Sequence, residues 1–195
     1  MDYKSEATIT HPAFIKAFLS SKSVTVLKGF GLVVAGSAMG KITASGKYAP
    51  VARTLVASTA LYGQADVTVD DASVFLAGQT IKLNQAASTT NAETGVIGSI
   101  VGNVITLTGN LTYTYSDGDV VSLNDGSQAA VGLLMATIDT GLGSATITTD
   151  PEYRDHDNAI LTSGDVYSAN CYGLDAIGRA ALNAQIDGNI TFCDL

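Results

Sequence analysis

The sequence predicts a mostly β fold of the α+β class, with its clearest helix near the C-terminal end. Three observations lead to this prediction. Apolar residues make up 46% of the 195 residues, and many are Ala, Val and Ile mixed with Thr and Ser, a composition typical of short strands. The chain has 20 glycines and only three prolines, which suits tight turns between such strands. Residues 174–185 alone combine helical apolar spacing with a glycine just beyond their end, at Gly188.

The first eleven residues mix charged side chains with Ser and Thr and have no apolar periodicity, so we predict a flexible arm at 1–11. Residues 7–10 have strand propensity, and we expect them to become ordered by adding a strand to the sheet edge of a partner. The residues predicted to make this contact are Lys4, Ser5, Glu6, Ala7, Thr8, Ile9 and Thr10.

A short helix is predicted directly after the arm, with Thr10 as its cap and Pro12 in its first turn. Two interpretations of this helix stay open. It packs on its own domain, or it docks on a partner. Its apolar face would consist of Phe14, Ile15, Phe18 and Leu19.

Residues 38–48 are predicted to form a strand, a turn and a second strand. Ser45-Gly46 is a turn dipeptide, and the segments before it, 24–27 and 31–36, are rich in β-branched residues and interrupted by glycine. The apolar anchors of the predicted hairpin are Met39, Ile42 and Tyr48.

Residues 55–124 carry their own strand signals and are predicted to form an inserted module of four to six antiparallel strands. Gly102-Asn103 separates two alternating stretches and favours a two-residue type II′ turn. A module of this length can have a modest core of its own. Its insertion into a surface loop costs little, because loop-closure entropy grows only slowly with loop length. The predicted strands lie near 67–69, 80–83, 95–100, 104–107 and 119–123.

The first domain is predicted to resume after the module, so that it comprises residues 12–54 and 125–195. Residues 128–135 are small and apolar and are predicted to form a buried strand. The remaining predicted elements are strands near 147–151, 158–167 and 189–192 and the helix at 174–185.

Charge is unevenly distributed along the chain. Residues 1–54 contain seven Lys or Arg and two carboxylates, whereas residues 55–195 contain three and sixteen. This asymmetry indicates a basic docking end and an acidic, solvent-facing end, or merely two modules of unrelated composition. The acidic body argues against binding to nucleic acid, because contact with phosphate groups requires clustered Lys and Arg. No apolar run is long enough for a membrane helix and no signal peptide is present, so we expect synthesis in the host cytoplasm and no membrane contact.

No catalytic, cofactor-binding or metal site is predicted. The glycines of residues 36–43 are spaced wrongly for a phosphate-binding loop, and residues 29–34 lack the third glycine of a dinucleotide fingerprint. The sequence also has no nucleophile elbow. The densest titratable cluster is interpreted as a solvated acidic loop, because the glycine turn and distal Glu of a calcium loop are absent. It contains Asp150, Glu152, Asp155, His156 and Asp157.

The two cysteines, Cys171 and Cys193, fit no metal-ligand spacing and are expected to be reduced, buried thiols rather than a disulfide. The tyrosines are expected to fill the core or an interface rather than to form a stacking surface. These tyrosines include Tyr62, Tyr113, Tyr115, Tyr167 and Tyr172.

One contiguous segment carries a family resemblance. Residues 40–48 have the sequence Gly-Lys-Ile-Thr-Ala-Ser-Gly-Lys-Tyr. This segment resembles the signature stretch of the head decoration, or capsid cement, proteins of lambda-like tailed bacteriophages. The resemblance extends to the arm before it, to a buried strand after it, and to an Ala-rich helix followed by a strand at the end of the chain.

The resemblance implies a lambda-type decoration domain interrupted by the module at 55–124, and a structural virion protein rather than an enzyme. It implies binding to the major capsid protein on the outer surface of the expanded head, assembly as a trimer at local threefold positions, and no cofactor. The arm at 4–10 would be the capsid-binding segment. A tail or surface adhesion protein whose β module binds a ligand is the alternative.

Overall fold

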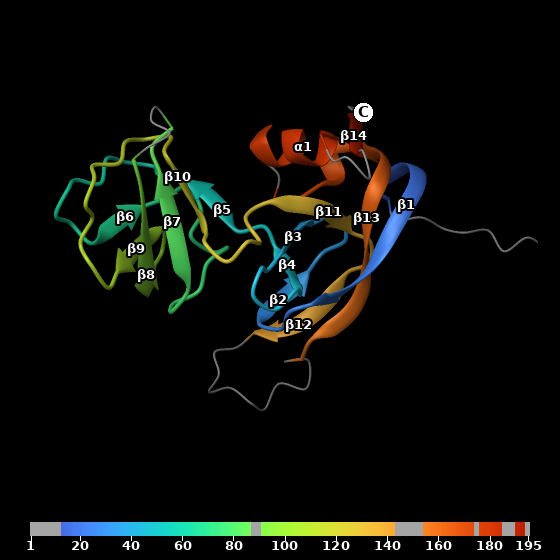
Figure 1. Cartoon of the computed structure of the whole chain (residues 1–195), viewed down its shortest axis with the longest axis horizontal. Helices are drawn as coiled ribbons and strands as arrows, with labels where there is room; N and C mark the ends of the chain where they lie inside the picture. Colours follow the sequence, from blue (N-terminus) through green and yellow to red (C-terminus); the bar gives the residue numbers. More distant parts are fainter. Residues whose placement is uncertain (1–12, 87–90, 143–153, 174–175, 185–189, 194–195) are drawn as a thin grey trace, which may run out of the picture. The chain divides into compact units, whose positions relative to one another are not determined.

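The computed structural model describes residues 13–86, 91–142, 154–173, 176–184 and 190–193, and these residues are mostly β-strand (Figure 1). The mostly β character predicted from composition is therefore confirmed.

The chain divides into two compact units. The terminal unit comprises residues up to Ala38 and from Gly132 onward, so both ends of the chain contribute to it. The central unit is the continuous stretch Met39–Val131, and the predicted module at 55–124 lies entirely within it.

Two long strands form the frame of the terminal unit. β1 (Ile15–Val26) and β13 (His156–Tyr167) have 12 residues each and pair antiparallel. β13 also pairs antiparallel with β11 (Ala130–Leu134) and in parallel with β14 (Ile190–Cys193). The buried strand predicted at 128–135 corresponds to β11, and the last predicted strand corresponds to β14.

The terminal unit also contains a small second sheet and one helix. β2 (Phe30–Val33) pairs antiparallel with β12 (Ile138–Leu142), a strand that the sequence did not predict. The helix α1 (Ala176–Asn183) confirms the described part of the helix predicted at 174–185. A short 3-10 turn, Ser168–Asn170, follows β13. The strand predicted near 147–151 lies outside the described residues.

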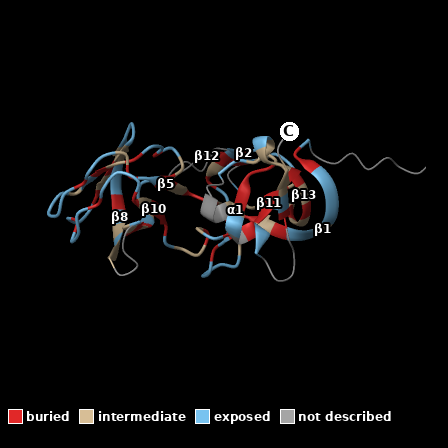
Figure 2. Cartoon of the chain, turned by 90° about the horizontal axis from the view of Figure 1, so that it is seen from above, coloured by how far each residue is buried: buried red, intermediate tan, exposed pale blue. Residues whose placement is uncertain are grey.

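The core of the terminal unit combines side chains from its long strands, α1 and the strands that pair with β13 (Figure 2). Gly132 and Gly164 are required for this packing. A Cβ on Gly132 would lie 2.7 Å from the carbonyl oxygen of Leu161, and one on Gly164 would overlap the carbonyl of Ala17. The buried apolar residues include Phe14, Ile15, Val24, Val26, Val33, Leu133, Leu134, Ile160, Leu161, Val166, Leu182 and Ile190.

The prediction of a helix after the arm is wrong for the residues that the structure describes. Thr10 and Pro12 lie outside the described residues, but Ile15 onward is the strand β1. Phe14 and Ile15 are buried whereas Phe18 and Leu19 are exposed, so these four residues do not share a buried helical face. Pairing with β13 outweighs the local helical spacing, because ten residue pairs along β1 are in register with that distant strand.

In the central unit, β3 (Ala38–Lys41) and β4 (Tyr48–Pro50) pair antiparallel and confirm the predicted hairpin. The amide of Gly46 donates to the carbonyl of Ile42, and the amide of Ile42 to the carbonyl of Lys47. Gly46 has φ +71°, a conformation that favours glycine. The three predicted anchors, Met39, Ile42 and Tyr48, are all buried.

The rest of the central unit is a six-stranded antiparallel sheet, within the range of four to six strands predicted from the sequence. Val101 pairs with Val104 across the predicted turn, where Gly102 has φ +57° and Asn103 does not have a positive φ, as a type II′ turn requires. In spatial order the strands are β5 (Arg53–Leu55), β10 (Val120–Leu123), β7 (Thr80–Asn84), β8 (Ala92–Val101), β9 (Val104–Leu107) and β6 (Asp66–Thr68).

This sheet closes on itself. Val56 and Val69, which follow the two outer strands, form an antiparallel bridge. The amide of Ala57 donates a hydrogen bond to the carbonyl of Thr68, and the amide of Asp70 donates one to the carbonyl of Leu55. Closure pairs the backbone groups that an open sheet would expose at its edges.

The closed sheet surrounds one apolar cluster, and Figure 2 shows buried residues along its strands. The cluster draws on five of the six strands, β6 to β10, and on the loops between them. Its largest members are Phe75, Ile81, Leu83, Ile97, Ile105, Leu107, Leu111, Tyr115 and Leu123.

Candidate functional site

The arm residues expected to bind a partner, 4–10, lie outside the described residues, but the residues that follow the predicted arm, 13 and 14, are described. Phe14 is buried, and its carbonyl accepts a hydrogen bond from the amide of Tyr167 at 2.9 Å. The side-chain amide of Asn170 donates to the carbonyl of Ala13 at 3.4 Å. Residues 13 and 14 are therefore held at the end of β13, and this point, from which the predicted arm would start, is here called the arm origin.

Next to this origin, β1 exposes four consecutive residues, Lys16 to Leu19. The register between β1 and β13 shifts between Ile15 and Ala17 and again between Phe18 and Ser20. Such bulges interrupt the alternation of inward and outward side chains. The result is a surface of Lys16, Phe18 and Leu19, here called the root surface, in which Phe18 is 37% exposed and Leu19 is 71% exposed.

The two cysteines lie near this end of the terminal unit, and both are free and only partly buried, which corrects the expectation of fully buried thiols. The ammonium of Lys16 lies 3.7 Å from the sulfur of Cys193. Burial raises the pKa of Cys171 to about 11, although the nearby Arg179 acts in the opposite direction. The Cys171 thiol therefore stays protonated at neutral pH, and a protonated thiol is a poor nucleophile and metal ligand.

The β3–β4 hairpin, which contains the segment of family resemblance, packs closely against residues 125–127 of the same unit. The amide of Thr43 donates to the carbonyl of Asp125 at 2.8 Å, and Ser127 is completely buried. A Cβ on Gly40 would overlap the carbonyl oxygen of Ser127. Gly40 is therefore required by packing, and the exposed residues of the hairpin are Lys41, at the end of β3, and residues 43–46 of the turn.

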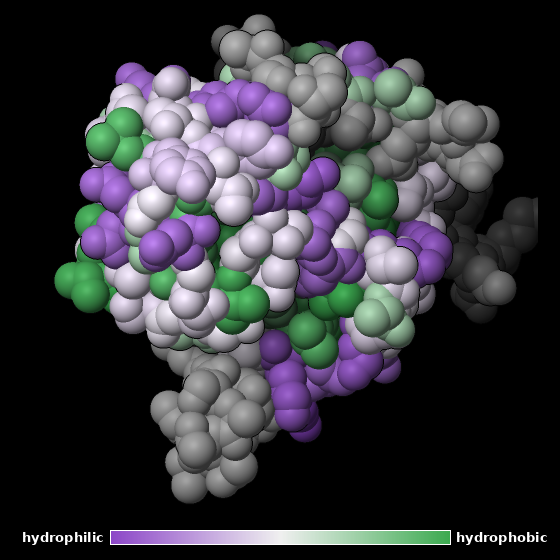
Figure 3. All heavy atoms as spheres, turned by 60° about the vertical axis from the view of Figure 1, so that its left-hand side comes forward, coloured by the Kyte–Doolittle hydropathy of each residue, from purple (hydrophilic) through white to green (hydrophobic). Residues whose placement is uncertain are grey.

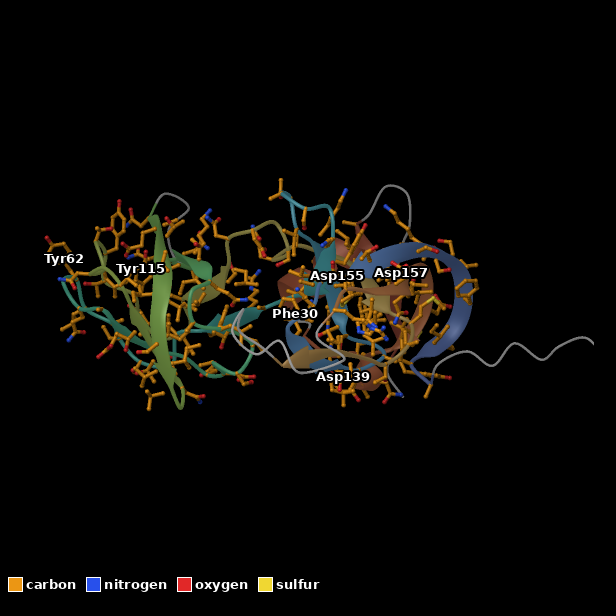
Figure 4. The ribbon with its side chains drawn as sticks, turned by 90° about the horizontal axis from the view of Figure 1, so that it is seen from below. Phe30, Tyr62, Tyr115, Asp139, Asp155 and Asp157 are labelled. Carbon is orange, nitrogen blue, oxygen red and sulfur yellow. The ribbon has the colours of Figure 1, made fainter. Side chains whose placement is uncertain are left out.

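The acidic cluster predicted at 150–157 is described only in part, since Asp150 and Glu152 lie outside the described residues. Asp155 accepts a hydrogen bond from the amide of Lys28, and Asp157 accepts one from the hydroxyl of Thr25. Figure 4 shows both carboxylates in the terminal unit. Among the described residues there is no group of three or more His, Cys, Asp or Glu that could hold a metal ion.

The closed sheet of the central unit exposes aromatic side chains that sequence reasoning treated as filler. Tyr62 is 72% exposed, Leu61 is 53% exposed and Tyr113 is 37% exposed. Tyr115, by contrast, is fully buried, as that reasoning allowed. Figure 4 shows Tyr62 at the tip of its loop and Tyr115 among the strands. Leu61, Tyr62 and Tyr113 are here called the tyrosine surface.

Beneath the tyrosine surface, one carboxylate organises the loop that carries Tyr113. Glu93 accepts hydrogen bonds from the amide and hydroxyl of Thr112, at 2.9 and 2.6 Å, and from the amide of Tyr113, at 3.3 Å. Burial first, and then the nearby Glu93 carboxylate, raise the pKa of the Tyr115 phenol. No local sequence signal indicates this arrangement, because Glu93 lies about twenty residues before the groups that it binds.

Comparison with known proteins gives no relative: no family model matches the chain, and neither a curated protein nor a solved structure matches it. The helix in the described part of the chain is too short to span a bilayer.

Proposed function

We propose that this chain is a structural virion protein that binds the outer surface of an expanded bacteriophage head and cements its shell, in the manner of the lambda-like decoration proteins. The observation that carries the proposal is the contiguous segment at residues 40–48, which resembles the signature of that family. In this proposal the α+β decoration domain comprises residues 12–54 and 125–195 and includes α1 and β14, while the β module at 55–124 is inserted into it.

The geometry of the arm origin supports the proposal. Residues 13 and 14 are held by hydrogen bonds and burial, so an arm that starts there projects from a fixed point. The root surface beside it offers a cation and two exposed apolar side chains, which suit a protein interface whose centre is desolvated. The arm would add a strand to a shell subunit while the root surface packs against that subunit.

Ordering the arm has a large entropic cost, about 1–2 kcal/mol for each residue fixed. One arm therefore binds weakly, whereas the arms of one oligomer act together through their high effective concentration. For this reason we propose a homotrimer that contacts several subunits of the major capsid protein at once, without cofactor, metal, nucleic acid or catalytic step.

The proposal is tested by mixing the full chain with DNA-free heads in their expanded and compact forms and separating bound from free protein by sedimentation. Mass photometry of the free protein gives its oligomeric state. We expect a small oligomer that sediments with expanded heads and stays free with compact ones. Equal binding to both forms, or binding to neither, would refute the proposal.

A further inference from the structure

The tyrosine surface is built from two loops that are joined over their length. Ala60 and Tyr115 form an antiparallel bridge with hydrogen bonds of 2.9 and 2.8 Å. The amide of Tyr62 donates to the hydroxyl of Thr114 at 3.1 Å, and the amide of Gly63 to the carbonyl of Leu111 at 2.9 Å. Because the amide of Tyr62 is bonded to Thr114, the residue directly after Tyr113, the two exposed tyrosines lie on adjacent stretches of the two loops.

These loops are held in place by the protein itself. Leu61 donates its amide to the side chain of Gln64, and Glu93 binds Thr112 and Tyr113 from below. A surface that is already ordered loses little conformational entropy when it binds, which lowers the cost of recognition. The two exposed tyrosines are therefore carried by ordered loops, and such a surface is suited to binding a ligand.

The size of the surface argues against a stable protein partner. An aromatic side chain buries about 150–250 Å² when fully covered, so the three partly exposed side chains of the tyrosine surface together offer on the order of 300 Å². A stable protein interface buries about 800 Å² on each partner. On the face seen in Figure 3, hydrophobic residues lie in small separate groups between hydrophilic and neutral ones, so they do not extend into a large apolar face.

The charge of the module selects against anionic ligands. Residues 55–124 contain six carboxylates and a single cation, Lys82. The Glu93 carboxylate is bonded to the backbone amide of Tyr113, within the loop that carries the tyrosine surface. Phosphate groups, acidic lipids and anionic polymers would therefore be repelled from it.

The polar groups beside the tyrosines are neutral hydroxyls and amides. The side chain of Gln85 donates to the carbonyl of Thr114 at 2.7 Å and accepts from the side chain of Asn91 at 2.9 Å. Thr112 and Thr114 place hydroxyl groups in the same loop. A hexopyranose ring presents C–H groups on one face and hydroxyls around its edge, and it matches an aromatic face bordered by such groups.

From the juxtaposition of Tyr62 and Tyr113 on these fixed loops, we infer that the module binds a neutral polysaccharide, with sugar rings stacked on the tyrosine surface. The site lies in the central unit and does not depend on the proposed binding of the arm to a phage head. Either proposal can therefore fail without the other.

Affinity electrophoresis in native gels tests the inference with the full chain. The gels contain a soluble glucan, mannan, galactan or glycol chitin as neutral polymers, or alginate as an anionic one. We expect at least one neutral polymer to retard the chain and alginate to have no effect. Tyr62→Ala and Tyr113→Ala should each weaken the retardation at least tenfold, whereas Val101→Ala, an equally exposed apolar position on the β8–β9 hairpin, should not change it.

Thermal unfolding of each variant controls for folding. Tyr62→Ala should have the melting temperature of the wild type, because the Tyr62 side chain is mostly exposed. Three results would overturn the inference: no retardation by any of the neutral polymers, equal retardation of the wild type and Tyr62→Ala, or equal retardation by alginate. Self-association that Tyr62→Ala abolishes would assign the surface to a second copy of the chain and would overturn it as well.

Discussion

Replacing Gly40 by alanine would make a methyl group overlap the carbonyl oxygen of Ser127, well inside the 3.0 Å that real Cβ atoms keep from such an atom. The neighbouring atom belongs to the backbone of a completely buried residue, so it cannot rotate away as a side chain would. One of the two segments must move, and this shift would strain the hydrogen bond from the amide of Thr43 to the carbonyl of Asp125.

The expected loss of stability follows from these two effects. Overpacking of a well-packed site costs about 1–3 kcal/mol, and a weakened backbone hydrogen bond adds about 1 kcal/mol. We therefore expect Gly40→Ala to reduce the free energy of unfolding by about 3 kcal/mol. For a unit of this size that loss lowers the melting temperature by roughly 12–24 °C.

Differential scanning calorimetry of the full chain measures this change, and Gly109→Ala is the matched control. Gly109 has no atom within 4 Å of its would-be Cβ and no positive φ, so its substitution should be neutral or slightly stabilising. If Gly40→Ala melted within 2 °C of the wild type, the close packing of the β3–β4 hairpin against residues 125–127 would be wrong.

Three further predictions concern the root surface, Glu93 and Cys171. Leu19→Ser should weaken binding to expanded heads by about 10–100-fold in the sedimentation assay, since burying a leucine side chain stabilises a complex by about 1.5–3 kcal/mol. The control is Leu32→Ser, at a similarly exposed position of β2, and this variant should bind as tightly as the wild type. Glu93→Ala leaves three donors without their acceptor and should cost about 1–3 kcal/mol in urea unfolding; Glu93→Gln should cost less, and equal losses would contradict the assigned contacts. Because the pKa of Cys171 is raised to about 11 from an ordinary value near 9, its alkylation by iodoacetamide should accelerate up to about pH 11, and the stability that the neutral thiol contributes should be lost as the pH rises above about 9. Alkylation of Cys171 that levels off near pH 9 would contradict that shift.

Local features of the fold were predictable from the sequence because their causes are local. Ser45-Gly46 and Gly102-Asn103 specify their turns through glycine conformations that other residues rarely adopt. The apolar positions of the β3–β4 hairpin were likewise evident from alternation, and Met39, Ile42 and Tyr48 are buried as predicted.

The errors arise where distant residues decide the structure. Residues 14–19 have helical spacing, yet pairing with β13, more than 130 residues away in sequence, makes them the start of a strand. The closure of the central sheet depends on a bridge between Val56 and Val69, and neither flank has a sequence signal for it. In the same way, the exposure of Tyr62 and Tyr113 follows from loops that Glu93 and Thr114 hold in place.

The central claim is that the arm holds this protein on the outside of an expanded head. The most direct measurement is sedimentation of expanded heads with the full chain and with a chain that begins at residue 11, together with the melting temperature of each. The account predicts that removing residues 1–10 abolishes binding and leaves the melting temperature unchanged, because Phe14 is the first buried residue in the described part of the chain. Binding of the shortened chain at the level of the full chain would contradict it.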